Sequence, residues 1–210
     1  ELLKSREILI QELHHRIRNS IQVAISLAGL QMRQAADGAT REQFLKHGNR
    51  LKAIGLVYRT LYREQDFTRL DIGAFVTDLC TELGRVYRGS EMSFSIQVEA
   101  TLLSLEQAVP FALIVNELVT NALVHAFEAG ERGSIQVSLR HSLPGRVQLT
   151  VADDGTGISA ERLKSASGGT GLDLVRMLAR QLDASLEVDH VQGTTYRVAF
   201  KDAAAGPMPS

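Results

Sequence analysis

Three polar residues on one predicted helix carry the clearest chemistry in the chain. Residues 116–126 have a helical pattern, in which Glu117, Asn121 and His125 are spaced four apart and therefore lie in one row. Hydrophobic residues occupy a different face of the same helix. A carboxylate, an amide oxygen and an imidazole in one row can hold a divalent cation and a polyphosphate. The row therefore points to a nucleotide site.

Two glycine-rich segments follow this helix along the chain. The first reads Asp153-Asp154-Gly155-Thr156-Gly157, and the second reads Gly168-Gly169-Thr170-Gly171. Glycine lets the backbone turn tightly, and the amino end of a helix can receive phosphate oxygens. In this order, the three motifs resemble the ATP site of the GHKL superfamily, which includes gyrase, Hsp90, histidine kinases and MutL.

The GHKL resemblance implies a role for each matching residue, with ATP and Mg²⁺ as cofactors. Asn121 would bind the metal, and Glu117 would act in catalysis by orienting a metal-bound water or polarising the phosphate acceptor. Asp153 would accept a hydrogen bond from the exocyclic amine of adenine. Residues 159–168 would form a mobile lid over the nucleotide. The other residues implied to contact the nucleotide are Asn116, His125, Gly155, Gly157, Gly169, Thr170, Gly171 and Thr194.

The first predicted helix carries two adjacent histidines in different environments. On a helical wheel His14 lies at the edge of an apolar stripe, so it is a candidate structural residue, whereas His15 lies roughly opposite and should face solvent. Taken alone, His15 has a simpler interpretation as a surface histidine without a function. The stripe consists of Ile10, Leu13, Ile17, Ile21, Ala24 and Ala28.

The residues around His15 favour a phosphoacceptor instead. Residues 12–22 read E-L-H-H-R-I-R-N-S-I-Q and resemble the phosphoacceptor box of a subgroup of two-component sensor histidine kinases, in which the second histidine is phosphorylated. The resemblance extends over nearly the whole chain, with the motifs in the family order. Related HWE kinases begin their nucleotide helix with histidine, but Asn116 stands here and the chain has no Trp. The resemblance is therefore to the HHR-type subgroup.

This resemblance implies an ATP-dependent protein-histidine kinase. His15 would be phosphorylated from ATP, and the phosphoryl group would pass to an aspartate of a response regulator. Arg16 follows His15 where common histidine kinases have an acid, so Glu12, one turn earlier, is a candidate orienting or basic group. An exposed charge without a role is an equally good interpretation of Glu12.

Residues 1–63 are predicted to form a helical hairpin for dimerisation and histidine phosphotransfer. Its helices would span residues 1–35 and residues 40–63, with Thr40 and Gln43 as a capping box for the second. Two helices cannot bury their apolar surfaces alone. We therefore predict a homodimer that forms a four-helix bundle, and packing against an upstream segment is the alternative.

The remainder is predicted to be a linker over 64–70, the GHKL catalytic domain over 71–201 and a disordered tail over 202–210. Asp71 can cap a helix over 72–87. Strands and helices are mixed along the chain, and several strands are joined by hairpins. This order favours an α+β sandwich with helices on one face of a mixed sheet. The predicted strands are 93–98, 135–139, 147–151, 186–190 and 195–200, and the further helices are 107–127 and 171–182.

Composition limits the remaining classes of function. A formal net charge of −1 argues against general binding to nucleic acid or to a membrane surface. The sequence contains no run of about 18 apolar residues, so we expect no membrane-inserted segment. The lone cysteine, Cys80, excludes an intramolecular disulfide and suits a reducing compartment, so we expect a cytoplasmic location. The chain opens within a helix, and we expect a sensory domain upstream.

Two other functions stay open at this stage. One is a non-catalytic phosphorelay or scaffold protein with a degenerate ATP domain. The other is a GHKL ATPase or a protein serine kinase that acts on another protein. The intact Glu117, Asn121 and Asp153 argue against the first, and the histidine box argues against the second.

Overall fold

The structure is a computed structural model that describes residues 2–64, 69–87, 92–128, 131–143, 145–157, 171–190 and 192–202. The chain divides into two compact units, Glu1–Thr68 and Arg69–Ser210. The fold class is the predicted one, an α+β chain with a helical hairpin followed by a mixed-sheet domain. The predicted lid, part of the linker and the tail beyond residue 202 lie outside the described residues.

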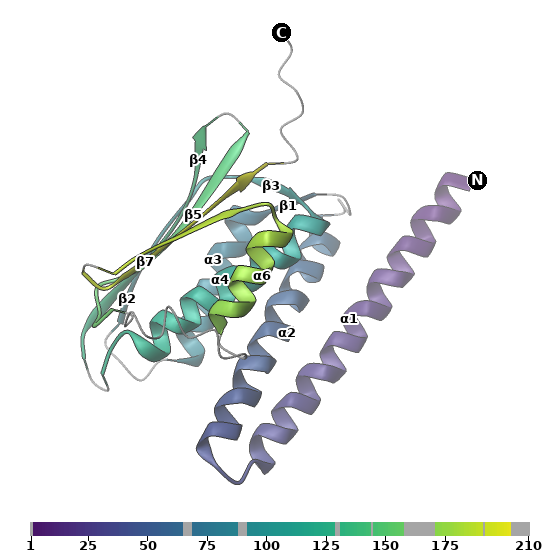
Figure 1. The fold of residues 1–210 in the computed structure, drawn as a ribbon. Helices are drawn as coiled ribbons and strands as arrows, with labels where there is room; N and C mark the ends of the chain where they lie inside the picture. Colours follow the sequence, from purple (N-terminus) through teal and green to yellow (C-terminus); the bar gives the residue numbers. More distant parts are fainter. Residues whose placement is uncertain are drawn as a thin grey trace. The chain divides into compact units, whose positions relative to one another are not determined.

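The first unit is a hairpin of two long helices, α1 (Leu2–Gln34) and α2 (Gly38–Glu64) (Figure 1). Glycines on α2 let the two helices approach closely. A Cβ added at Gly55 would stand 3.4 Å from Cγ2 of Ile21, and one at Gly48 would stand 3.9 Å from Cβ of Ala28. The inner face of α1 therefore packs on small residues of α2.

The capping box predicted at the start of α2 is wrong in its position. Asp37, rather than Thr40, caps the helix, because its carboxylate accepts hydrogen bonds from the Thr40 backbone N–H and the Thr40 hydroxyl, both at 2.8 Å. Thr40 lies inside the first turn. Aspartate is among the strongest capping residues, and here it precedes the threonine by three positions. The helix consequently begins two residues earlier than predicted.

The apolar residues of α1 divide between two faces, in contrast to the single predicted stripe. Ile21 and Ala28 lie towards α2, but Leu13 is exposed. Three further large hydrophobic residues of α1 are also exposed, namely Val23, Leu27 and Leu30, and Val23 is 68% exposed. The helix thus has a second apolar row that the hairpin does not cover.

The second unit opens with a short strand that leads directly into a capped helix. The strand β1 (Arg69–Asp71) pairs antiparallel with β3 (Leu102–Ser104). Asp71 ends this strand and, as predicted, caps α3 (Ile72–Val86) by accepting the Gly73 N–H at 2.9 Å. Residues 69–70, predicted as part of the linker, therefore belong to the domain. Three-residue strands have too few positions to show a periodic pattern.

The main sheet of the second unit has five strands in the order β2-β4-β5-β7-β6. β2 pairs with β4 in parallel, and the other pairs are antiparallel, so the sheet is mixed as predicted. β4 and β5 extend beyond the predicted strands at both ends. The strand bounds are β2 (Met92–Val98), β4 (Gly133–Leu143), β5 (Arg146–Asp153), β6 (Ser185–Asp189) and β7 (Thr194–Lys201).

Helices α3, α4 (Leu105–His125) and α6 (Gly171–Gln181) cover one face of this sheet (Figure 1). Burial alternates along β5 and β7, so every second residue packs against the helices. The rings of Phe111 on α4 and Phe200 on β7 lie 5.6 Å apart between centroids. α4 has the length and hydropathy of a membrane span, but 67% of that window is buried within the protein, as in a core helix.

The cap of α3 gives a direct test of this fold. We expect Asp71→Ala to lower the free energy of unfolding by about 1 kcal/mol, because the Gly73 N–H loses its acceptor. Asp71→Asn keeps a side-chain oxygen and should retain most of the stability. Urea denaturation of the whole chain measures both, and an equal loss in the two variants would contradict the capping role.

Candidate functional site

The predicted polar row lies on α4 and runs from the protein interior to its surface. Glu117 is only 4% exposed, Asn121 is half-buried, and His125 is exposed. Asn116, 1% exposed, donates a hydrogen bond from Nδ2 to Oε1 of Glu117 at 3.0 Å. A buried carboxylate is costly unless hydrogen bonds satisfy it, and Asn116 supplies one. The row therefore places a carboxyl group at its buried end and opens to solvent at His125.

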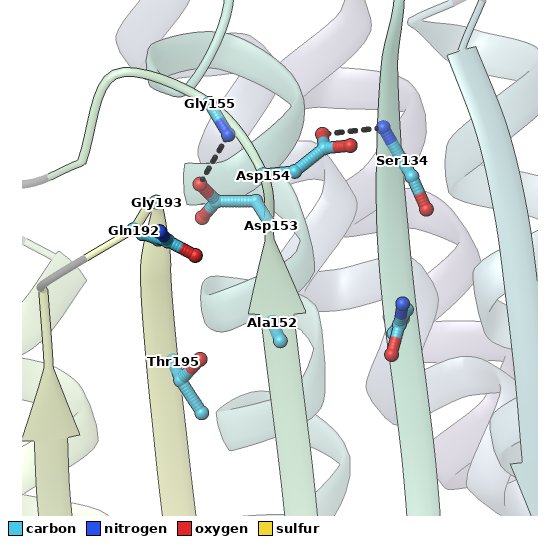
Figure 2. Close-up of a pocket in the computed structure, with 9 residues that line it drawn as sticks. Ser134, Ala152, Asp153, Asp154, Gly155, Gln192, Gly193 and Thr195 are labelled. Carbon is cyan, nitrogen blue, oxygen red and sulfur yellow. Dashed lines mark hydrogen bonds between the residues drawn. The ribbon is translucent and has the colours of Figure 1, made fainter.

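Asp153 ends β5 with its carboxylate held by backbone N–H groups. Oδ1 accepts from Gly155 N at 3.2 Å and from Thr194 N at 3.1 Å, and the residue is 7% exposed. Figure 2 shows the contact with Gly155. Burial raises the pKa of this carboxyl, and the hydrogen bonds from Thr194 and Gly155 act in the opposite direction. The structure thus fixes an acceptor at the strand end, as adenine recognition would require.

The Asp-Gly turn approaches two other segments closely at glycines, the end of α4 at Gly155 and the β6–β7 connection at Gly193. A Cβ at Gly155 would collide with the carbonyl of Ala126, which accepts the Thr156 N–H at 2.8 Å. Gly193 has φ +71° and lies against the carbonyl of Asp153. The turn, the α4 end and the β7 hairpin therefore meet closely.

Gly171 brings the third predicted motif to the polar row. A Cβ added at Gly171 would stand 2.5 Å from Oε2 of Glu117 and 3.5 Å from Oδ1 of Asn121. The amino end of α6 therefore lies beside the carboxylate and the amide, which suits the binding of phosphate oxygens and a cation there. Gly169 and Thr170, predicted to bind the nucleotide, lie outside the described residues.

A small cavity lies among these segments on the helix side of the sheet. Its volume is about 30 Å³, close to the share of one water molecule, so a bound base would have to widen it. Sequence reasoning had not singled out Ala126 or Tyr196, since an alanine and a strand tyrosine have no chemical signal of their own. The lining residues are Asn121, Ala122, His125, Ala126, Asp153, Gly157, Thr194 and Tyr196.

A larger hollow, of about 550 Å³, lies on the open face of the sheet (Figure 2). It is lined by small and polar residues such as Ser134, Ala152 and Thr195. Asp154 lies on this side and accepts the Ser134 N–H at 2.7 Å, which joins the ends of β5 and β4. The residues of the polar row do not line this hollow. The larger volume therefore does not identify the nucleotide site. The smaller cavity is the better candidate, because Asn121 and His125 line it.

The metal donors in the described part of the chain do not form a site by themselves. No group of three or more His, Cys, Asp or Glu residues there could hold a metal ion. Mg²⁺ keeps several waters and is often bound by one or two protein oxygens together with substrate phosphates. The amide oxygen of Asn121 beside the α6 start fits a metal that arrives with a triphosphate.

In the other unit, His15 lies exposed on α1, as predicted. Its Nδ1 is 3.4 Å from Nδ2 of Asn19, one turn further on. Glu12 pairs with Arg16 at 2.8 Å, and the hydrogen bond from Arg16 lowers the pKa of the Glu12 carboxyl. A carboxylate with a lowered pKa is a weaker base, so this pairing disfavours Glu12 as the group that takes a proton from His15. The His14 side chain lies outside the described residues.

The mixed sheet, with helices on one face and a glycine-containing turn at the end of β5, has the architecture predicted for a GHKL-type ATP-binding domain, and the helical hairpin exposes His15. Residues 12–87 match the family described as histidine kinase. Residues 106–204 match the family described as histidine kinase-, DNA gyrase B- and HSP90-like ATPase. The chain therefore belongs to the histidine kinases of two-component systems.

Several known histidine kinases resemble this chain along most of its length. Blue-light-activated histidine kinase 2 of Erythrobacter litoralis is 30% identical over 85% of the chain, and the sensor histidine kinase PdtaS of Mycobacterium tuberculosis is 27% identical over 88%. The chain spans only 52% and 37% of these relatives. The solved histidine kinase domain of an E. litoralis blue-light-activated kinase matches 96% of the chain, with a TM-score of 0.72 and 25% identity, and 94% of that domain is covered.

Asp153→Asn tests the proposed adenine contact. We expect it to weaken ADP binding by roughly ten- to a hundred-fold, because it removes a hydrogen bond to a charged group. Isothermal titration calorimetry measures the dissociation constant. Unchanged ADP affinity would exclude Asp153 from adenine recognition.

The same variant should not lower stability at neutral pH. Since burial raises the pKa of Asp153 above 3.8, the folded state keeps this proton to higher pH than the unfolded chain does. The free energy of unfolding of the wild-type chain therefore falls, relative to that of the variant, as the pH rises from about 3.8 through the raised pKa of Asp153. Urea denaturation at acid and neutral pH measures this difference, which would be absent if the carboxyl were freely solvated.

Proposed function

We propose that this chain autophosphorylates His15 from ATP and then passes the phosphoryl group to an aspartate of a response regulator. The observation that carries the proposal is an exposed histidine on a two-helix hairpin, in the same chain as a site with an anchored Asp153 and a polar α4 row. We place the reaction in the cytoplasm, under the control of a sensory domain upstream.

In the nucleotide site, each residue has a distinct task. Asp153 accepts a hydrogen bond from the adenine amine, and the Gly155–Gly157 turn lies under the base. Asn121 would contribute its amide oxygen to Mg²⁺, His125 would contact phosphate from the exposed end of the row, and Glu117 would orient a water bound to the metal. When bound, the triphosphate would supply the phosphoryl group and Mg²⁺ would neutralise part of its negative charge.

We assign the attack to Nε2 of His15, because Asn19 lies on the Nδ1 side of the ring. If the Asn19 carboxamide presents its oxygen to an Nδ1–H, it would stabilise the tautomer in which Nε2 keeps its lone pair. Nε2 then attacks the γ-phosphorus, a P–N bond forms as the bond to the leaving oxygen breaks, and ADP departs. The Nδ1 proton is released afterwards to solvent.

The second apolar row of α1 supports a homodimer. Leu13, Val23, Leu27 and Leu30 are exposed at spacings compatible with a coiled-coil seam, since intervals of ten, four and three residues keep them on one side of the helix. A second copy that offers the same row would bury it in a four-helix bundle. The partner copy is therefore proposed as the cover of this row.

The acid lability of the phosphorylated product tests the proposed reaction. Incubation with γ-labelled ATP should label the wild-type chain with an acid-labile, base-stable phosphate, and His15→Ala should abolish the label while ADP binding persists. His14→Ala is the neighbouring control and should retain it. An acid-stable label would favour a serine kinase. ATP hydrolysis without any label would favour a GHKL ATPase, and no ATP binding would favour a scaffold protein.

A charge in the exposed apolar row tests the proposed dimer. We expect Leu27→Arg to convert the dimer to a monomer in light-scattering chromatography, because two arginines would face each other in the bundle. Gln22→Arg places the same charge at an exposed polar position of α1 and should leave the dimer intact. A wild-type chain that is monomeric would contradict the dimer without affecting the proposed phosphorylation.

A further inference from the structure

Two residues of α4 that the proposed mechanism does not use are buried beside Glu117. Asn116 and Thr120 are 1% and 4% exposed. Within the described part of the chain, Oδ1 of Asn116 and Oγ1 of Thr120 are buried side-chain atoms without a hydrogen-bond partner. Buried polar atoms nearly always have a hydrogen-bond partner, so two such atoms without one in a core helix require an explanation. Packing alone would have favoured apolar residues at both positions.

The geometry gives Asn116 a defined direction. A carboxylate only accepts hydrogen bonds, so the Asn116 group that lies 3.0 Å from Oε1 of Glu117 must be the amide N–H. This orientation turns Oδ1 away from Glu117. Thr120 lies one turn further along the same face of α4. Its hydroxyl does not reach that oxygen directly in the structure, but one water between the two would accept from the hydroxyl and donate to the amide oxygen. The hydroxyl, the amide and the carboxylate then form one chain of hydrogen bonds.

We propose that Asn116 and Thr120 form a positioning pair that fixes the Glu117 carboxylate for phosphoryl transfer. Thr120 holds the Asn116 amide in its orientation, and Asn116 holds Glu117 next to Asn121 and the start of α6. The low dielectric of the core strengthens such a chain when all its members are satisfied. This inference rests on the proposed kinase function and adds Thr120 as a residue that determines its rate.

The measurement is the single-turnover rate of His15 phosphorylation at saturating ATP, together with ADP affinity and melting temperature. We expect Asn116→Leu to slow the transfer by about 10- to 100-fold and Thr120→Val to slow it by about tenfold, the range for residues that orient a functional ligand. ADP affinity should remain close to that of wild type, because Asn116 is buried against Glu117 and does not line the cavity, in contrast to the nucleotide contact expected from the sequence. Thr120→Ser, which keeps the hydroxyl, should restore the wild-type rate.

α4 also offers a matched control at its other end. Gln107 donates from Nε2 to the Lys201 carbonyl at 3.0 Å and, like Asn116, has a buried carboxamide oxygen without a partner in the described residues. It lies ten residues from Glu117, about 15 Å along the helix. Gln107→Met therefore removes a similar amide from the same helix. It should leave the transfer rate unchanged.

A double-variant cycle separates positioning from general damage to the fold. If Asn116 acts through Glu117, Asn116→Leu should add no further loss in a Glu117→Gln background. Equal losses in both backgrounds, or parallel falls in ADP affinity and melting temperature, would overturn the proposal. A wild-type rate in Asn116→Leu would also overturn it while leaving the kinase function intact. Absence of phosphorylation in the wild-type chain would instead reject the kinase function.

Discussion

The nucleotide domain depends on one buried carboxylate held by the backbone. Asp153 accepts N–H groups from its own turn and from the first residue of β7, so a single side chain joins two segments that lie far apart in sequence. The Ala126 carbonyl then binds the same turn to α4. Because glycine at positions 155 and 193 permits these approaches, the acceptor is fixed before any ligand arrives, which limits the reorganisation that binding requires.

The polar side of α4 shows a second constraint, which is the burial of polar groups at a cost in stability. A helix this apolar could have filled its inner face with hydrophobic residues, but it buries Asn116, Glu117 and Thr120 instead. Each buried polar group costs free energy unless it is fully hydrogen-bonded. Local departures from good packing concentrate at functional sites in natural proteins. A chemical role, such as the one proposed for Glu117 beside Gly171, would explain why these three residues are buried here.

Much of the architecture was predictable because the signals were local. The periodic helices, the alternating strands and the Asp71 cap each depend on neighbouring residues, and the structure contains them. The pairing of β1 with β3, the Asp37 cap and the exposure of Leu13 were missed. β1 and β3 are too short for a pattern, and Thr40 with Gln43 offered a competing capping signal. A helical wheel does not reveal which apolar residues find a partner. Tyr196 and Ala126 enter the site only through tertiary contacts.

In the proposed reaction the two reacting groups come from opposite environments, and this difference would determine how the reaction can be controlled. The carboxyl groups of Glu117 and Asp153, proposed to act at the nucleotide, are buried, whereas His15 is exposed on the other unit. Phosphoryl transfer depends mainly on positioning and on neutralising charge, and an imidazole left in water contributes neither until it reaches the phosphate. A signal that alters the approach of the two units would therefore change the rate by a large factor without altering either site.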